Sequence, residues 1–141
     1  MRLNLSSQIV FNKVPEEFYN PKTAVERSEI TREEHIPTDI LPTVEEGACR
    51  IADAIVSEIK AKEQLGKYCV LGLGTGQSLT PVYNELIQRF EKKEVSFKSV
   101  VVFNAYEYFP LAADNQHSAI NQLRERFLSH VDIPEQNIYT L

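Results

Sequence analysis

Two short apolar runs separated by a helical pattern constrain the fold of this chain more than any other feature. The runs are YCVLGL at residues 68–73 and SVVVFN at residues 99–104. The second run has no polar interruption before its last residue, which indicates a strand buried on both faces, as in a parallel sheet covered by helices. Between the runs, Val82, Leu86 and Phe90 have helical spacing after a helix start near Pro81. A strand, a helix and a parallel strand form a right-handed crossover unit.

Helical patterns also flank this unit. Thr43 and Glu46 have capping-box form, and an apolar stripe then recurs at spacings of three and four until Gly66. A further helix is expected over residues 118–130 before Pro134 ends it. In the first of these helices, the residues predicted to face inward are Val44, Ala48, Ile51, Ala52, Ile55 and Ile59. In the second helix they are Ile120, Leu123, Phe127 and Val131. Arg124, Glu125 and Arg126 of the second helix are predicted to face outward.

The order of these elements predicts an α/β fold with three layers and a mainly parallel sheet. Two strands make a small sheet when typical sheets have about four to six. We therefore expect an incomplete fold from a longer protein, with a third strand either in the N-terminal region or near residues 138–141.

Residues 1–41 are expected to form an irregular arm, and residues 42–141 the α/β domain. The prolines at 15, 21, 37 and 42 interrupt any sustained periodicity in the arm, which leaves room for helical turns near residues 15–19 and 23–34. Apolar residues in the arm favour packing on its own domain or on a second copy, so we expect a homo-oligomer.

Composition excludes several classes of function. A net charge of −5 and a pI of about 5.2 argue against a nucleic-acid partner. The apolar runs are far shorter than the roughly 20 residues that span a membrane, and no basic segment followed by an apolar one opens the chain. A cytoplasmic protein is expected. Cys49 and Cys69 lack metal-site spacing, so both are expected in the core and no metal is predicted.

The glycine-rich stretch GLGTGQSLTP at residues 72–81 lies between an expected strand and helix. Ligands bind beyond the carboxyl ends of strands in open α/β sheets, and helix N-termini favour anions. Gln77 stands where a dinucleotide motif needs glycine, and no lysine of a P-loop is present. The pattern favours a phosphorylated metabolite, although the glycines could serve only the turn.

The stretch FNAYEY at residues 103–108 should emerge at the same edge of the sheet. Alternation in an extended segment places Tyr106 and Tyr108 on one side and Glu107 on the other. The Glu107 carboxylate could act as a general base or could anchor a neighbouring backbone.

Three segments, GLGTGQSLTPVYNELI, VSFKSVVVFNAYEY and FLSHVDIPEQNIYTL, resemble the N-terminal part of glucosamine-6-phosphate deaminases (isomerases) in order and spacing. A fainter similarity extends to the 6-phosphogluconolactonase-like superfamily. The resemblance implies a sheet of the sugar-phosphate isomerase (Rossmann-like) type. It also implies conversion of glucosamine 6-phosphate to fructose 6-phosphate and ammonia, with a phosphorylated amino sugar as the partner and without a redox cofactor or metal.

The resemblance further implies site residues. The loop that holds the sugar phosphate matches Gly74, Thr75, Gly76, Gln77 and Ser78. In the family motif F-N-x-D-E-Y, an aspartate moves the C2 proton. Tyr106 occupies the aspartate position, and Glu107 matches the glutamate. These two are the candidate catalytic residues, although tyrosine is a weaker base than a carboxylate at neutral pH.

The remaining residues of the family's site belong to segments beyond Leu141, so we expect the 141-residue chain alone to be inactive. The Tyr106 substitution keeps two alternatives open. One is a non-catalytic domain that binds or senses a sugar phosphate. The other is a hydrolase of the 6-phosphogluconolactonase type.

Overall fold

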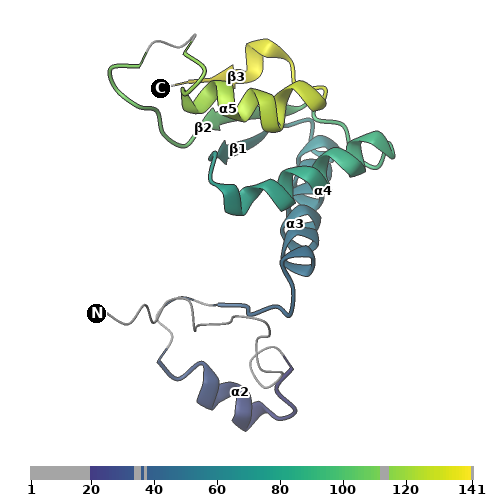
Figure 1. Cartoon of the computed structure of the whole chain (residues 1–141). Coiled ribbons are helices and arrows are strands. Elements are labelled where there is room, and N and C mark those ends of the chain that lie inside the picture. Colours follow the sequence, from purple (N-terminus) through teal and green to yellow (C-terminus); the bar gives the residue numbers. More distant parts are fainter. Residues whose placement is uncertain (1–19, 34–35, 37, 112–114, 141) are drawn as a thin grey trace, which may run out of the picture. The chain divides into compact units, whose positions relative to one another are not determined.

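The computed structural model describes residues 20–33, 36, 38–111 and 115–140, which are coloured in Figure 1. The chain forms two compact units, Met1–Glu46 and Gly47–Leu141. The domain boundary expected after residue 41 stays a prediction, and the helical turn expected at residues 15–19 lies outside the described residues.

The first unit contains the short helix α2 (Ala24–Ile30) within the expected arm. Thr23 caps it, because its hydroxyl accepts a hydrogen bond from the Glu26 amide at 3.1 Å while the Glu26 carboxylate accepts one from the Thr23 amide at 3.2 Å. None of its residues is buried. Local capping therefore accounts for this helix better than packing does.

The second unit is an α/β fold with a parallel sheet, as the sequence predicts. Its elements are α3 (Val44–Gln64, starting just before the unit), β1 (Cys69–Leu73), α4 (Thr80–Glu91), β2 (Val100–Asn104), α5 (Ala119–Arg126) and β3 (Ile138–Tyr139). The strands lie in the order β1-β2-β3 and all pair in parallel. Strand β3 occupies one of the two positions expected for a third strand.

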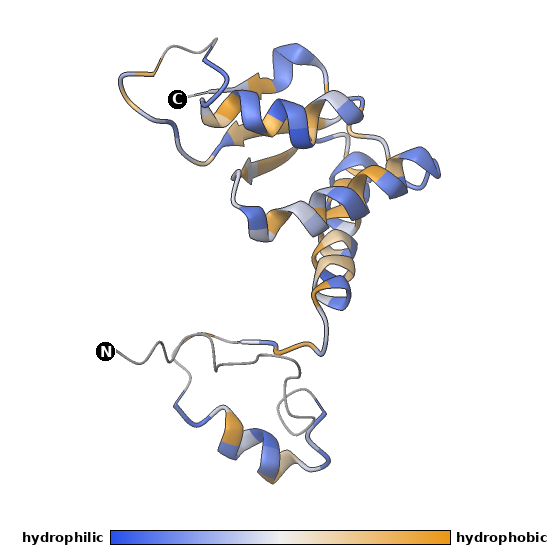
Figure 2. Ribbon diagram, in the orientation of Figure 1, coloured by the Kyte–Doolittle hydropathy of each residue, from blue (hydrophilic) through white to orange (hydrophobic). Residues whose placement is uncertain are grey.

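The core lies on one face of this sheet. Cys69 of β1 pairs in register with Val100 of β2, and both are almost fully buried. Side chains on the opposite face are more open, since Val70 is 62% and Phe103 is 45% exposed. The described helices thus cover one face of the sheet. The strands themselves consist mostly of hydrophobic residues (Figure 2). The sequence predicts that β2 is buried on both faces, but Phe103 of β2 is partly exposed. A third layer, on the open face of the sheet, stays a prediction.

Helix α3 is rotated relative to the predicted stripe. Val44 is 64% and Ile51 is 48% exposed, although both were expected inside, whereas Val56 is buried without having been predicted. The buried face is centred on Ala52 and Ile59, and neighbouring helix positions lie about 100° apart. Ile51 therefore falls at the edge of the stripe.

Two further expectations are corrected. Cys49 is exposed on α3, whereas Cys69 is buried as expected. The helix expected to reach residue 130 ends at Arg126 and is followed by a separate 3-10 turn at Leu128–His130. Arg126, expected to face outward, is only partly exposed, and its contacts belong to the site described next.

Candidate functional site

The glycine-rich loop and the segment after β2 meet at the carboxyl edge of the sheet. Leu73 and Asn104 end β1 and β2 in register, and the Ala105 amide donates to the Leu73 carbonyl at 2.7 Å. The loop then passes through a 3-10 turn (Gln77–Leu79) into α4. The sequence prediction that the two segments share one edge is therefore correct.

Three side chains from different elements hold this loop. The Tyr83 hydroxyl of α4 donates to the Gly74 carbonyl, and the Arg126 guanidinium of α5 donates to the Thr75 carbonyl. The Tyr106 hydroxyl, from the segment after β2, shares a hydrogen bond with the Thr75 hydroxyl. Thr75 is 6% exposed, so its side chain is part of the packed interior.

This bonding fixes the direction of the loop amides. In a planar trans peptide the carbonyl and the following N–H point in opposite directions. Because Tyr83 and Arg126 hold the carbonyls of Gly74 and Thr75, the amides of Thr75 and Gly76 point away from those two side chains. Neither amide donates a hydrogen bond to another residue in the described part of the chain. Unsatisfied N–H groups before a helix are suited to an anion.

The glycine at position 76 is not required by the backbone. Gly76 has φ of −59° and ψ of 143°, a conformation that any residue can adopt. A Cβ there would meet the Ser78 hydroxyl oxygen at 3.6 Å, an ordinary contact. Gly76, Gln77 and Ser78 are all exposed. Because Gly76 has no side chain, the space beside the loop amides is open and a ligand could approach them closely.

Tyr106 lies against this loop. Its side-chain ring comes within 3.9 Å of the position that a Cβ on Gly74 would take. The Tyr106 and Tyr108 rings contact each other edge to face, with centroids 5.7 Å apart, so they share one side of the segment as alternation predicts. A catalytic role for Tyr106 stays a prediction, while its position beside the predicted phosphate loop is observed.

Glu107 points to α5 instead. Its carboxylate accepts hydrogen bonds from the amides of Ala119 at 2.8 Å, Tyr108 at 2.9 Å and Ile120 at 3.2 Å. The bond from Ala119 is the main cause that lowers the pKa of Glu107, against a smaller effect of burial. The carboxylate therefore anchors the backbone at the start of α5, and its catalytic role stays a prediction.

Arg126 is the site residue that the sequence reasoning missed. The Arg124-Glu125-Arg126 run looks like the solvated face of a helix, and nothing local distinguishes its last member. Its contact with Thr75 joins residues 51 positions apart, so only the tertiary fold brings them together.

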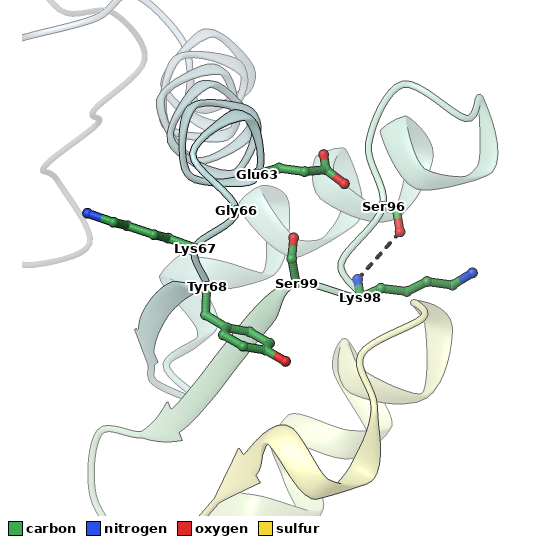
Figure 3. A pocket seen from close by; sticks show the side chains of 7 residues that line it. All are labelled: Glu63, Gly66, Lys67, Tyr68, Ser96, Lys98 and Ser99. Atoms are coloured by element: carbon green, nitrogen blue, oxygen red, sulfur yellow. Dashed lines mark hydrogen bonds between the residues drawn. The ribbon is translucent and has the colours of Figure 1, made fainter.

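A separate cavity of about 330 Å³ lies at the amino ends of β1 and β2 (Figure 3). The residues that line it are Glu63, Gly66, Lys67, Tyr68, Ser96, Lys98 and Ser99. In Figure 3 the amino groups of Lys67 and Lys98 point in opposite directions. The two cations do not converge on one anion, so the cavity lacks the polar arrangement found at the glycine loop.

Among the described residues, no three His, Cys, Asp or Glu side chains are grouped so that they could hold a metal ion. Within the same ranges, no helix is both long and apolar enough to cross a membrane.

Comparisons with known proteins agree on one family, although no family model matches the chain. A glucosamine-6-phosphate deaminase-like protein of Bacteroides thetaiotaomicron is 49% identical over 140 residues, which cover 99% of this chain and 21% of that protein. The glucosamine-6-phosphate deaminase of Mycoplasma mycoides is 34% identical over 71% of this chain and 39% of its own length. The chain belongs to the glucosamine-6-phosphate deaminase-like family.

Two solved structures support the fold independently. A monomeric glucosamine-6-phosphate deaminase of the NagB superfamily aligns with a TM-score of 0.64 and 28% identity, covering 70% of this chain and 39% of that one. A protein named devB aligns with a TM-score of 0.59 at 21% identity, which supports the fold alone. The chain thus spans about a fifth to two fifths of the length of the relatives it matches.

Proposed function

We propose that the glycine loop, from Gly74 to Ser78, binds the phosphate of glucosamine 6-phosphate, in a protein that converts this sugar to fructose 6-phosphate and ammonia. The observation that carries the proposal is the pair of loop amides, at Thr75 and Gly76, directed away from the side chains that hold the loop. The relatives are named for glucosamine-6-phosphate deaminase, which supports the choice of this sugar phosphate.

Calorimetric titration tests the choice of ligand. Glucosamine 6-phosphate should bind, inorganic phosphate should compete with it, and glucosamine should not bind measurably, because the loop recognises the phosphate group. Equal binding of glucosamine and its phosphate would contradict a phosphate-directed site.

A second candidate function is sugar-phosphate binding without turnover. Two observations favour it. The Tyr106 hydroxyl, which stands at the position of the family's aspartate, is engaged with Thr75, and the carboxylate of Glu107 is engaged with backbone amides near α5. The hydrolase of the 6-phosphogluconolactonase type stays a prediction that no specific contact favours.

Isotope exchange separates turnover from binding. In deuterated buffer, proton transfer at C2 would introduce deuterium into glucosamine 6-phosphate or release ammonia, and binding alone would do neither. Restoring the motif with Tyr106→Asp provides the comparison. The assay uses the whole protein, because the 141-residue chain alone is expected to be inactive. Exchange in the whole protein would reject the binding-only function. The absence of exchange and of ammonia release in both the whole protein and its Tyr106→Asp variant, despite sugar-phosphate binding, would reject the deaminase.

A further inference from the structure

Arg126 differs from Arg89 and Arg124 in that no carboxylate of the described residues pairs with it. Arg89 pairs with Asp53 and Glu85, and Arg124 pairs with Glu135. Within the described residues, no carboxylate lies within ion-pair distance of Arg126, although its side chain is partly buried. A partly desolvated cation without a counter-charge favours the arrival of an anion.

The position of Arg126 is fixed by the residue that follows it. Phe127 is fully buried, and its ring stacks on the Tyr83 ring with centroids 5.0 Å apart. Tyr83 also holds the Gly74 carbonyl, so the Tyr83–Phe127 pair includes one of the two groups that bind the loop carbonyls and directly follows the other, Arg126. The packing of Phe127 thereby places the backbone of Arg126 near the loop, and the hydrogen bond to the Thr75 carbonyl holds the guanidinium there.

A guanidinium has five N–H donors, and the contact with the Thr75 carbonyl uses one of its nitrogens. The Gly76 amide of the same peptide points away from the guanidinium. Arg126 therefore acts on an anion at this amide through its charge and through its hold on the peptide, rather than by a direct hydrogen bond.

We propose that Arg126 is a positioning residue of the anion site on the glycine loop: it holds the Thr75 carbonyl, so that the Gly76 amide points outward, and it adds a positive charge near the loop that favours a phosphate monoester. The inference deepens the proposed function and rests on it. It adds a cation from within this chain to a site whose remaining residues the family resemblance places beyond Leu141.

Titration of the 141-residue chain with inorganic phosphate tests this role, with the backbone amide resonances of Thr75 and Gly76 as the readout. Both resonances should shift with phosphate in the unsubstituted protein. Arg126→Gln should weaken the affinity by about tenfold, which corresponds to ~1.4 kcal/mol. Arg126→Lys should bind with intermediate affinity, since it keeps the charge but not the planar guanidinium.

Arg124→Gln is the matched control, because it removes the same charge from the same helix at a residue paired with Glu135. It should leave the phosphate affinity unchanged. Thermal unfolding of each variant distinguishes weaker phosphate binding from a loss of the fold. If Arg126→Gln is unstable, the phosphate affinity of Arg126→Lys provides the test instead.

The outcomes distinguish this inference from the function on which it rests. If phosphate binds and Arg126→Gln or Arg126→Lys binds it as tightly as the unsubstituted protein, the inference is wrong and the phosphate site stands. An equal loss in Arg124→Gln would also overturn it, because a general charge effect would then suffice. If phosphate shifts neither amide of the unsubstituted protein, both proposals fail.

Discussion

At the scale of single residues, two neighbours in one motif have different structural roles. The Tyr106 hydroxyl holds the Thr75 side chain, and the Glu107 carboxylate holds the start of α5. Strand alternation predicts that they face opposite ways, since it depends only on the period of an extended chain. It could not predict the partners, which lie 31 and 12 residues away in the sequence.

Glu107→Gln should make the stability of the protein less dependent on pH. Because the pKa of Glu107 is lowered in the folded state, its carboxylate stabilises the fold fully above the ordinary glutamate pKa of about 4.3, and this stabilisation is lost as the pH falls through the lower folded value. At pH 7 the substitution should lower the free energy of unfolding by about 1 kcal/mol, as for a lost helix cap.

Urea unfolding at pH 7 and pH 3 measures this difference. The gap in the free energy of unfolding between Glu107→Gln and the unsubstituted protein should narrow at pH 3, because below the ordinary glutamate pKa the unfolded state takes up a proton at Glu107 more readily than the folded state does. A gap of the same size at both values would show that the charge on Glu107 does not support α5.

The contact of Arg126 with the glycine loop could not be predicted from the residue pattern alone. A helical pattern assigns a side chain to a face, but the Arg124-Glu125-Arg126 run carries the same composition as any solvated helix face. Its contact with Thr75 depends on how α5 packs against the loop after β1, and that packing is set by buried residues such as Phe127.

At the scale of elements, α3 and α4 are joined by Arg89 as well as by their apolar faces. The Arg89 guanidinium contacts the carboxylates of Asp53 on α3 and Glu85 on α4, and its side chain is only 13% exposed. A third hydrogen bond reaches the Cys49 carbonyl at 3.4 Å. One side chain thus links the two helices with charge-assisted bonds, although Asp53 itself is 68% exposed.

Arg89→Met should therefore lower the free energy of unfolding by roughly 1.5 kcal/mol, a typical value for the loss of a hydrogen bond to a charged group. Lys62→Met is the control, because Lys62 pairs with Glu58 at 3.1 Å on the exposed surface of α3. It should change stability by less than about 0.5 kcal/mol. Equal effects in chemical unfolding would mean that Arg89 adds no more than a surface ion pair.

The order and type of the elements were predictable because each has a strong local pattern. Thr43 accepts a hydrogen bond from the Glu46 amide at 3.1 Å at the start of α3, as the capping pattern indicates. The rotation of α3, which exposes Ile51 and buries Val56, was not predictable from periodicity, because both residues are apolar and only the packing partner decides between them.

At the scale of the whole α/β unit, the sheet has one covered and one open face. Val102→Ala should lower the free energy of unfolding by about 2 kcal/mol, because Val102 is fully buried and truncation leaves a cavity. Val70→Ala should cost less than about 0.5 kcal/mol, since Val70 is 62% exposed. Comparable losses in thermal unfolding would show that the second face is covered in solution.

Assembly and location also belong to this scale and stay predictions. Self-association is expected from the apolar residues of the N-terminal region, and light scattering of the intact chain would measure it. The cytoplasmic location is expected from the opening residues of the sequence. The activity of the whole protein stays a proposal as well, because the chain spans 21% of its Bacteroides relative and 39% of its Mycoplasma relative.

Binding of glucosamine 6-phosphate to a matched pair of glycine variants tests the central claim most directly. Gly76→Val places a branched side chain beside the loop amides, whereas Gly72→Val places the same side chain on β1, where a Cβ meets nothing within 4 Å. Neither glycine has a positive φ, so valine fits the backbone at both positions. In calorimetric titration, Gly76→Val should abolish binding and Gly72→Val should bind as the unsubstituted protein does. Undiminished binding by Gly76→Val would contradict a phosphate site on this loop.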